Sequence, residues 1–216
     1  MAQSDQSSTL DSPPPTSPKI DGDRTRGAIL RAAQALFVEH GFATTSMATV
    51  AKQAGVTKSL IHHHFGSKRE LWDAVRNVVM EDYQRQQQEL LNQRAPDLSL
   101  VEDSLVVYFR FLQSNPDVMR LWSWMVIEND AQCASLSQAL SRAGVETLRR
   151  AQEQGDMRTD VEPEYVLAQF FALVRGWFSE RAVMQANILA GIPDETCDER
   201  YLKSAVRVFI DGIRAR

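Results

Sequence analysis

The sequence predicts an all-α protein. After residue 20, apolar side chains recur at intervals of three and four in almost every segment, which is the spacing of one helix face. No run rich in Val, Ile and Thr alternates as a half-buried strand would. Capping residues, Gly and Pro divide the chain into successive helical segments.

The first segments have local boundary signals. A helix is expected over residues 23–40, and Gly41 ends it. A short helix follows, whose first turn Thr45 can cap because its hydroxyl can accept a hydrogen bond from a backbone N–H. Gly55 ends that helix, since only Gly takes the left-handed conformation without a Cβ penalty.

The next helices start from similar signals. Thr57 caps a short helix over Lys58–His64, in which Ile61 faces the core. Ser67 and Glu70 form a capping box, so a long helix begins after Ser67. The long helix is expected over residues 68–93, and the later helices over 99–114, 117–129, 135–154, 163–189 and 196–214.

Two short helices joined by a tight turn are the layout of a helix-turn-helix, which places its second helix in the DNA major groove. The outward positions of the second short helix are therefore candidates for contact with bases. They are Lys58, Ser59, Leu60, His62 and His63.

A dense motif accompanies this layout. It consists of Gly41-Phe42, Thr44-Thr45, Val50-Ala51, Ala54-Gly55-Val56-Thr57, Ile61, His64-Phe65 and Ser67-Lys68-x-x-Leu71. With these residues the chain resembles the TetR/AcrR family of bacterial transcriptional regulators. The match covers Arg24 to about Val79, and the rest of the chain resembles the family in size and helical layout.

The resemblance implies roles in DNA binding. Base edges would meet Lys58, Ser59, Leu60 and His63. Phosphates would meet Thr45, His62 and the start of the long helix at Lys68. The chain departs from the family where His62 replaces the usual Tyr and Ser59 replaces a frequent Gly. The full predicted set is Thr45, Ser46, Thr57, Lys58, Ser59, Leu60, His62, His63, His64 and Lys68.

The charge distribution agrees with this interpretation. Residues 19–80 hold nine Lys and Arg against five Asp and Glu, a net charge of +4, and all four His. Residues 81–216 hold fifteen against twenty-one, a net charge of −6. A basic end on an acidic body suits DNA binding, because phosphate contacts release counterions. By itself, +4 over sixty residues is also ordinary surface charge.

The domain organisation follows from composition and motif. Residues 1–20 are expected to form a disordered tail, rich in Pro and Ser, that is no signal peptide. Residues 21–70 are expected to form the DNA-binding domain, and residues 71–216 an effector-binding and dimerisation domain. The lack of a membrane-length apolar run and the presence of only two cysteines fit a reduced cytoplasm.

The helix over 163–189 is apolar around much of its circumference, so it must be covered from two sides. The helix over 196–214 supplies one layer, and a second copy of the chain can supply another in a four-helix bundle, although a larger monomeric core would also suffice. The resemblance implies the same homodimer. The predicted interface residues are Phe170, Phe171, Phe178, Leu202, Val206 and Phe209.

Ligand sites in helical proteins lie between helices and are mostly apolar. The predicted pocket residues are Phe109, Trp122, Met125, Phe170, Leu173, Arg175 and Trp177. Arg175 interrupts an apolar run, so it needs a partner, either a carboxylate such as Glu128 or an anionic ligand, unless it faces solvent. Each aromatic residue could equally be plain core.

No phosphate-binding, dinucleotide, zinc-protease or serine-hydrolase motif occurs, so no cofactor, metal or catalytic residue is predicted. The three consecutive histidines fan out by about 100° each around a helix and cannot share one ligand face. The prediction is therefore a homodimeric repressor that binds a palindromic operator and is released by a small effector. The alternatives are a regulator gated by a protein partner or constitutively active, and an all-α enzyme using the C-terminal cavity.

Overall fold

The structure is a computed structural model that describes residues 18–129 and 138–215. Within these residues every regular element is a helix, which confirms the all-α prediction. Most of the segment assigned to the tail, and Cys133, lie outside the described part of the chain. No helix among the described residues combines the length and hydropathy needed to cross a membrane.

Most helix boundaries lie within three residues of those expected, but α1 begins at Pro18, inside the segment that was expected to form the tail. The elements are α1 (Pro18–Thr44), α2 (Met47–Ala54), α3 (Lys58–Phe65), α4 (Lys68–Gln93), α5 (Leu98–Ser114), α6 (Pro116–Ile127), α7 (Gln138–Glu153), α8 (Pro163–Asn187) and α9 (Asp194–Ile213). Gly41 has non-helical torsion angles (φ 78°, ψ 178°), so the continuous part of α1 ends where the sequence predicts. Gly55 takes the predicted left-handed conformation at the end of α2 (φ 68°).

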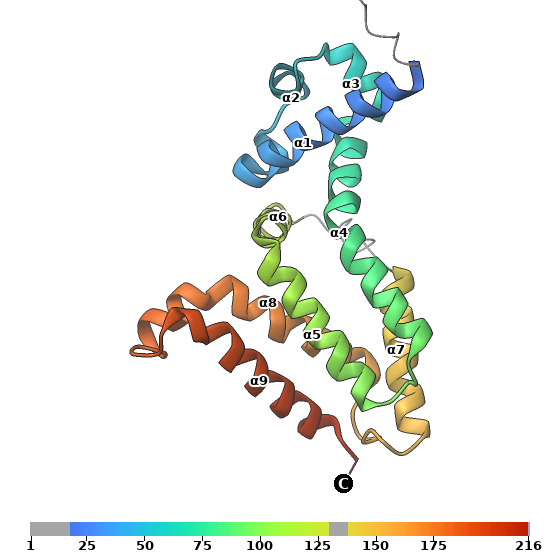
Figure 1. Cartoon of the computed structure of the whole chain (residues 1–216), viewed down its shortest axis with the longest axis vertical. Coiled ribbons are helices and arrows are strands. Elements are labelled where there is room, and N and C mark those ends of the chain that lie inside the picture. Colours follow the sequence, from blue (N-terminus) through green and yellow to red (C-terminus); the bar gives the residue numbers. More distant parts are fainter. Residues whose placement is uncertain (1–17, 130–137, 216) are drawn as a thin grey trace, which may run out of the picture.

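The first three helices and the start of α4 form one unit at the end of the molecule (Figure 1). Their shared core contains Ile29, Phe37, Val50, Ile61 and Trp72, all fully buried or nearly so. The ring of Phe37 meets the edge of Trp72 at 4.8 Å between centroids. Burial of aromatic rings on this scale contributes several kcal/mol and fixes how α3 is held against α1 and α4.

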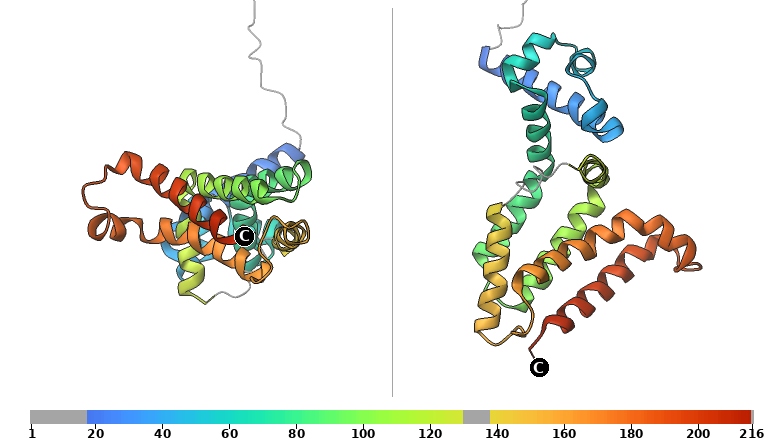
Figure 2. Two further views of the ribbon diagram at one scale, coloured as in Figure 1. Left: turned by 90° about the horizontal axis from the view of Figure 1, so that it is seen from below. Right: turned by 180° about the vertical axis from the view of Figure 1, so that it is seen from behind.

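The C-terminal domain packs α5 against α4 on one side and against α8 and α9 on the other. Helices α8 and α9 run side by side and meet at a tip, which is clearest from behind (Figure 2). The turn after α7 joins the end of α9 through backbone hydrogen bonds, Arg158 N to Ile213 O (2.9 Å) and Ala215 N to Asp156 O (3.0 Å). This closes the domain at the end away from the N-terminal unit (Figure 1).

Helix α6 connects the two parts of the molecule. Its residues Leu121 and Met125 are buried in the core of the N-terminal unit. The indole Nε1 of Trp124 donates to the carbonyl of Val38 in α1 (3.1 Å). Because α6 also packs on α5 and α8, it belongs to both cores.

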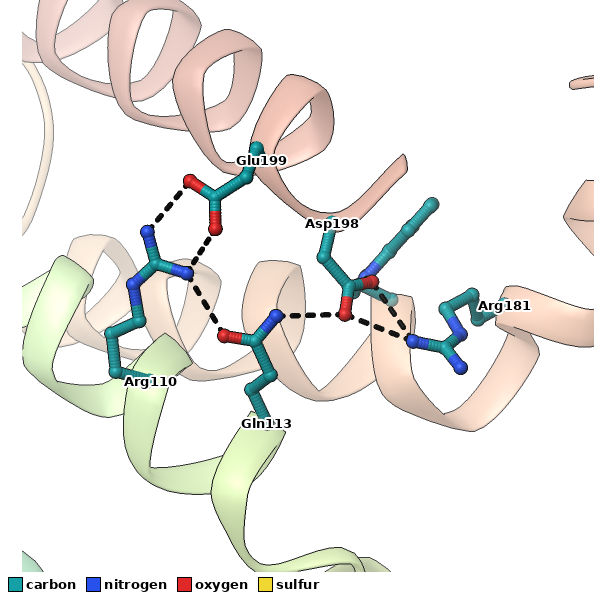
Figure 3. A network of polar contacts seen from close by, with 6 residues as sticks. Arg110, Gln113, Arg181, Asp198 and Glu199 are labelled. Atoms are coloured by element: carbon teal, nitrogen blue, oxygen red, sulfur yellow. Dashed lines mark hydrogen bonds and ion pairs between the residues drawn. The ribbon is translucent and has the colours of Figure 1, made fainter. Parts of the chain in front are cut away.

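A buried carboxylate fixes the α8–α9 pair to α5 (Figure 3). Asp198 accepts hydrogen bonds from Trp177 Nε1 (2.9 Å), Arg181 Nη1 (2.9 and 3.0 Å) and Gln113 Nε2 (2.9 Å). Burial opposes the ionisation of Asp198, but these hydrogen bonds and the charge of Arg181 hold the pKa of its carboxyl below the usual range. The network therefore stabilises the orientation of the helix pair.

We expect Asp198→Ala to lower the free energy of unfolding by about 2 kcal/mol, because the buried indole N–H of Trp177 loses its acceptor. Since a lowered pKa stabilises above the pKa of the unfolded group, this stabilisation is present at neutral pH and lost in acid as pH falls through the lowered value. Urea unfolding at pH 7 and at pH 3 measures the loss of stability in the variant and its dependence on pH. The control is Glu199→Ala, which removes a neighbouring but exposed pair with Arg110. Equal losses for the two variants would contradict a special role for Asp198.

Candidate nucleic-acid interface and ligand cavity

The start of α2 differs from the prediction by one residue. Ser46, and not Thr45, is the N-cap, and its hydroxyl oxygen accepts from Thr49 N (3.0 Å). Thr45 is buried, and its hydroxyl donates to the carbonyl of Gly41 (2.7 Å). The predicted phosphate contact of the Thr45 side chain is therefore wrong, and the exposed hydroxyl at this helix start belongs to Ser46.

Helix α3 is oriented by its own two buried residues. Ile61 and Phe65 face the core, and Thr57 caps the helix by accepting from Leu60 N (3.3 Å), as predicted. Four of the predicted base-contact or phosphate-contact side chains are then exposed together, while Leu60 and His64 are half-buried. The exposed ones are Lys58, Ser59, His62 and His63.

The ring of His62 is held at the C-terminal end of α3, where Nδ1 lies within hydrogen-bonding distance of the carbonyl oxygen of Gly66. A carbonyl can only accept, so Nδ1 carries the hydrogen and Nε2 is left for an outside partner. A phosphate contact by His62 stays a prediction, and Nε2 could donate to a phosphate only in the imidazolium form, in which both ring nitrogens carry a hydrogen.

The Lys68 amine has a partner within the protein. Its Nζ donates to the carbonyl of Ala43 (3.1 Å) and lies 4.4 Å from the ring centroid of Phe42. Partial burial lowers the pKa of Lys68, and the nearby carboxylate of Glu128 opposes that shift. The amine is thus used within the protein, and a phosphate contact by the backbone N–H of Lys68, in the first turn of α4, stays a prediction.

Glu128 lies at the contact between α6 and α1 and is not beside Arg175. The carboxylate of Glu128, just after α6, accepts from the backbone N of Ala43 (2.9 Å), near the end of α1 and beyond the kink at Gly41. The alternative that Glu128 pairs with Arg175 is therefore wrong. Gly41 makes this approach possible, since a Cβ there would lie 2.7 Å from the Trp124 ring.

A cavity of about 220 Å³ lies between α4, α5, α6 and α8, with one residue of α7 at its edge. Three of the predicted pocket residues line it, namely Trp122, Met125 and Arg175. Phe170 instead lines a second cavity of about 50 Å³. The other three predicted residues are not part of either wall: they are Phe109, Leu173 and Trp177.

Sequence reasoning missed the residues with which α4 and α5 line this cavity. Arg76, Met80 and Tyr83 lie on one face of α4, at intervals of four and three, and Tyr108 faces them from α5. The helical spacing on α4 was the available signal, but a core face and a cavity wall have the same spacing.

The predicted interface residues are mostly used inside the protomer. Phe170 and Leu202 are buried, so they cannot form a surface between subunits. Phe171 lines both cavities, and Phe178 packs on Phe109 at 4.8 Å between ring centroids. The remaining two, Val206 and Phe209, are half-buried against the core.

The outer face of the α8–α9 pair carries other residues. Val183 of α8 is 63% exposed and Val208 of α9 is 70% exposed. A Cβ added at Gly176 of α8 or Gly212 of α9 would meet no atom within 4 Å. These four positions are open within the described part of the protomer.

A helix-turn-helix with an exposed second helix, joined by α4 and α6 to a helical domain with a cavity, defines a DNA-binding transcriptional regulator. The chain belongs to the TetR family. The family model for bacterial regulatory proteins of the tetR family matches residues 29–75, and the model for the tetracyclin repressor-like C-terminal domain matches residues 105–207.

Among curated relatives, the chain is 28% identical to the transcriptional activator FasR of Mycolicibacterium smegmatis over 112 residues, which are 52% of this chain and 49% of FasR. The chain spans about half or less of the length of the first curated relatives it matches. The solved structure of the regulator SCO4942 from Streptomyces coelicolor has a TM-score of 0.68 and 25% identity, and covers 88% of this chain and 98% of its own. The structure of SmeT, the repressor of a Stenotrophomonas maltophilia multidrug efflux pump, has a TM-score of 0.65 and 23% identity. The match covers 90% of this chain and 92% of the SmeT chain.

Proposed function

We propose that this protein is a cytoplasmic, homodimeric repressor that binds a palindromic operator and is released by a small molecule in the α4–α8 cavity. The observation that carries the proposal is the position of α6. Leu121 and Met125 line the cavity and are at the same time buried in the core of the DNA-binding unit. A ligand that changes the packing of α6 must therefore act on both parts.

DNA binding is assigned to the exposed face of α3 in each protomer. Lys58, Ser59 and His63 would meet base edges, and the capped start of α2 at Ser46 would meet a phosphate. Two copies of α3 reach successive major grooves if the half-sites lie one helical turn or a multiple apart. The operator is therefore expected to be a palindrome.

Dimerisation is assigned to the outer face of α8 and α9. Packing two such helix pairs gives a four-helix bundle, which would cover the exposed valines, Val183 and Val208. The open positions at Gly176 and Gly212 would let the helices approach closely. The surface proposed here replaces the interface residues of the sequence prediction, which pack mostly inside the protomer.

The effector acts only if it binds one dimer geometry better than the other. The hydrogen bonds from Trp124 to Val38 and from Ala43 to Glu128 connect α6 to α1 on the side facing the DNA-binding unit. A ligand on the opposite side of α6 would shift the contact between α6 and α1. This shift would change the distance between the two α3 helices of the dimer.

The cavity also bears on the alternatives. A regulator without a small ligand would be expected to fill this space with side chains, as cores normally do. Catalysis would need a converging acid, base or nucleophile set, and the tyrosines and arginines of the wall do not form one. Repression needs only occupation of a promoter, so we propose repression and not activation. Among the relatives, FasR is an activator.

Selection of bound fragments from random DNA with purified protein tests the proposal directly. We expect a palindromic consensus, and a reporter carrying it should be silenced by the protein. No enrichment, or enrichment of single half-sites, would contradict the proposal, and increased reporter activity would contradict its sign.

Lys58→Ala should change the selected sequence at particular base pairs and lower operator affinity by about 1–3 kcal/mol. Arg85→Ala, which removes the same charge from an exposed site on the distal half of α4, is the matched control and should leave the consensus unchanged. Fluorescence anisotropy with the consensus and its single-base variants measures both. Equal effects of the two variants on operator affinity and base preference would show that α3 does not contact the bases.

A further inference from the structure

The cavity between α4, α5, α6 and α8 carries a positive charge, that of Arg175, for which the described residues supply no carboxylate partner. Its wall includes Arg76 and Arg175 and, among the described residues, no Asp or Glu. Arg76 is paired with Asp73 at 2.8 Å. No carboxylate of the described residues lies within ion-pair distance of Arg175.

Stacking holds the guanidinium of Arg175 in place. Its central carbon lies 4.0 Å from the ring centroid of Trp122 and 5.3 Å from that of Phe171. Its Nε donates to the carbonyl of Phe171 (3.2 Å). The group is always charged and planar, and its two terminal nitrogens have no hydrogen-bond acceptor among the described residues. Arg175 is thus held in position, and no described residue neutralises its charge.

Two buried phenols lie in the same wall. Tyr83 and Tyr108 are only 4% and 5% exposed, and their ring centroids are 5.0 Å apart. Neither hydroxyl has a hydrogen-bond partner among the described residues. Burial raises the pKa of Tyr108 to about 12 and that of Tyr83 further, while the charge of Arg175 opposes both shifts. Both phenols are therefore neutral hydrogen-bond donors close to Arg175.

The rest of the wall is apolar apart from Ser141. It is made by Val79, Met80, Leu112, Val118, Met119, Leu121, Trp122, Met125 and Phe171. The volume of about 220 Å³ exceeds the ~150 Å³ in which a protein cavity can hold benzene. It admits one ring or a short chain.

We propose, on the basis of the effector role proposed above, that the ligand of this cavity is a small organic acid with an apolar body. Its carboxylate would lie between the terminal nitrogens of Arg175 and the hydroxyls of Tyr83 and Tyr108. A carboxylate matches the planar guanidinium with two parallel hydrogen bonds, and it supplies the charge that a half-buried arginine lacks. The apolar body would contact Met119 and Met125. Through Met125 it would act on the contact between α6 and α1.

Calorimetric titration of the full-length protein with matched acids and amides tests this inference. The probes are phenylacetate and hexanoate, each against its primary amide, with acetate as the acid that lacks an apolar body. We expect the two larger acids to bind at least tenfold more tightly than their amides and than acetate, since a charged hydrogen bond contributes enough for that factor.

Arg175→Met keeps an apolar stem against Trp122 and should weaken the acids at least tenfold while leaving the amides unchanged. Tyr83→Phe and Tyr108→Phe remove one hydroxyl each and should weaken the acids severalfold, and they keep the inference testable if Arg175→Met does not fold. Arg150→Met, at an exposed site on α7, is the control and should change nothing.

The outcomes separate the two proposals. Acids that bind through Arg175 but do not release operator DNA would support the ligand class and contradict the effector role. Amides that bind as well as acids, or acids unaffected by Arg175→Met, would overturn the ligand class, and release of DNA by such ligands would still leave the effector role standing. Failure of all the acids to bind at millimolar concentration would overturn the ligand class.

Discussion

Gly176→Glu is expected to give a folded monomer whose operator affinity is lower by at least a hundredfold. Within the protomer a Cβ at this position of α8 would meet no atom within 4 Å, and Glu is a better helix former than Gly. In the proposed four-helix bundle the same side chain places a charge in an apolar contact between two copies, at a cost of several kcal/mol. Losing the second half-site removes an avidity gain of about 10² to 10⁴.

Light scattering, far-UV circular dichroism and operator titration measure these effects together. Gly176→Ala is the matched control and should remain dimeric with unchanged or slightly higher thermal stability. Val208→Asp, at a 70% exposed site on α9, should reproduce the monomer by a different helix. Dimers in both charged variants would show that the subunits meet elsewhere.

Gly41→Ala is expected to lower the free energy of unfolding by about 3 kcal/mol or more. The torsion angles at this residue (φ 78°, ψ 178°) belong to a region used almost only by Gly, and another residue there costs on the order of 1–3 kcal/mol. The new Cβ would also lie 2.7 Å from the Trp124 ring and 2.8 Å from a carboxylate oxygen of Glu128. Moving Trp124 would break its hydrogen bond to Val38, at a further cost of about 1 kcal/mol.

Gly55→Ala separates the two causes. Gly55 also has a positive φ (68°), but a Cβ there would meet nothing within 4 Å, so only the backbone cost of about 1–2 kcal/mol applies. Urea unfolding of the three proteins gives the difference. If both variants lost the same stability, the close approach of α6 to α1 would not be a tight contact.

Helix ends were predicted well because their causes are local. The capping box of Ser67 and Glu70 forms in both directions, and α4 runs over the expected residues. Thr57 and Gly55 act as predicted at either end of the turn. The N-cap of α2 was misplaced because Thr45 and Ser46 are both capping residues, and packing against α1 turns only the second one outward.

Assignments that depend on distant neighbours were less accurate. The sequence marked Arg175 as unusual, but its surroundings come from Trp122 on α6 and from the tyrosines of α4 and α5. The apolar residues of α8 and α9 were expected to meet a second subunit, whereas Phe170 and Leu202 fill the core of their own protomer. Hydrophobic spacing indicates which residues are buried, but not against what.

The sequence by itself determined the all-α fold, the positions of the turns and the composition of the exposed α3 face, because these follow from capping, glycine torsion angles and short-range periodicity. Only the tertiary structure decided where the cavity lies and which charged residues line it. It also decided how α6 connects the cavity to the DNA-binding unit. Those properties arise from side chains that are far apart in the chain and meet only after the helices pack, so no local pattern of residues contains them.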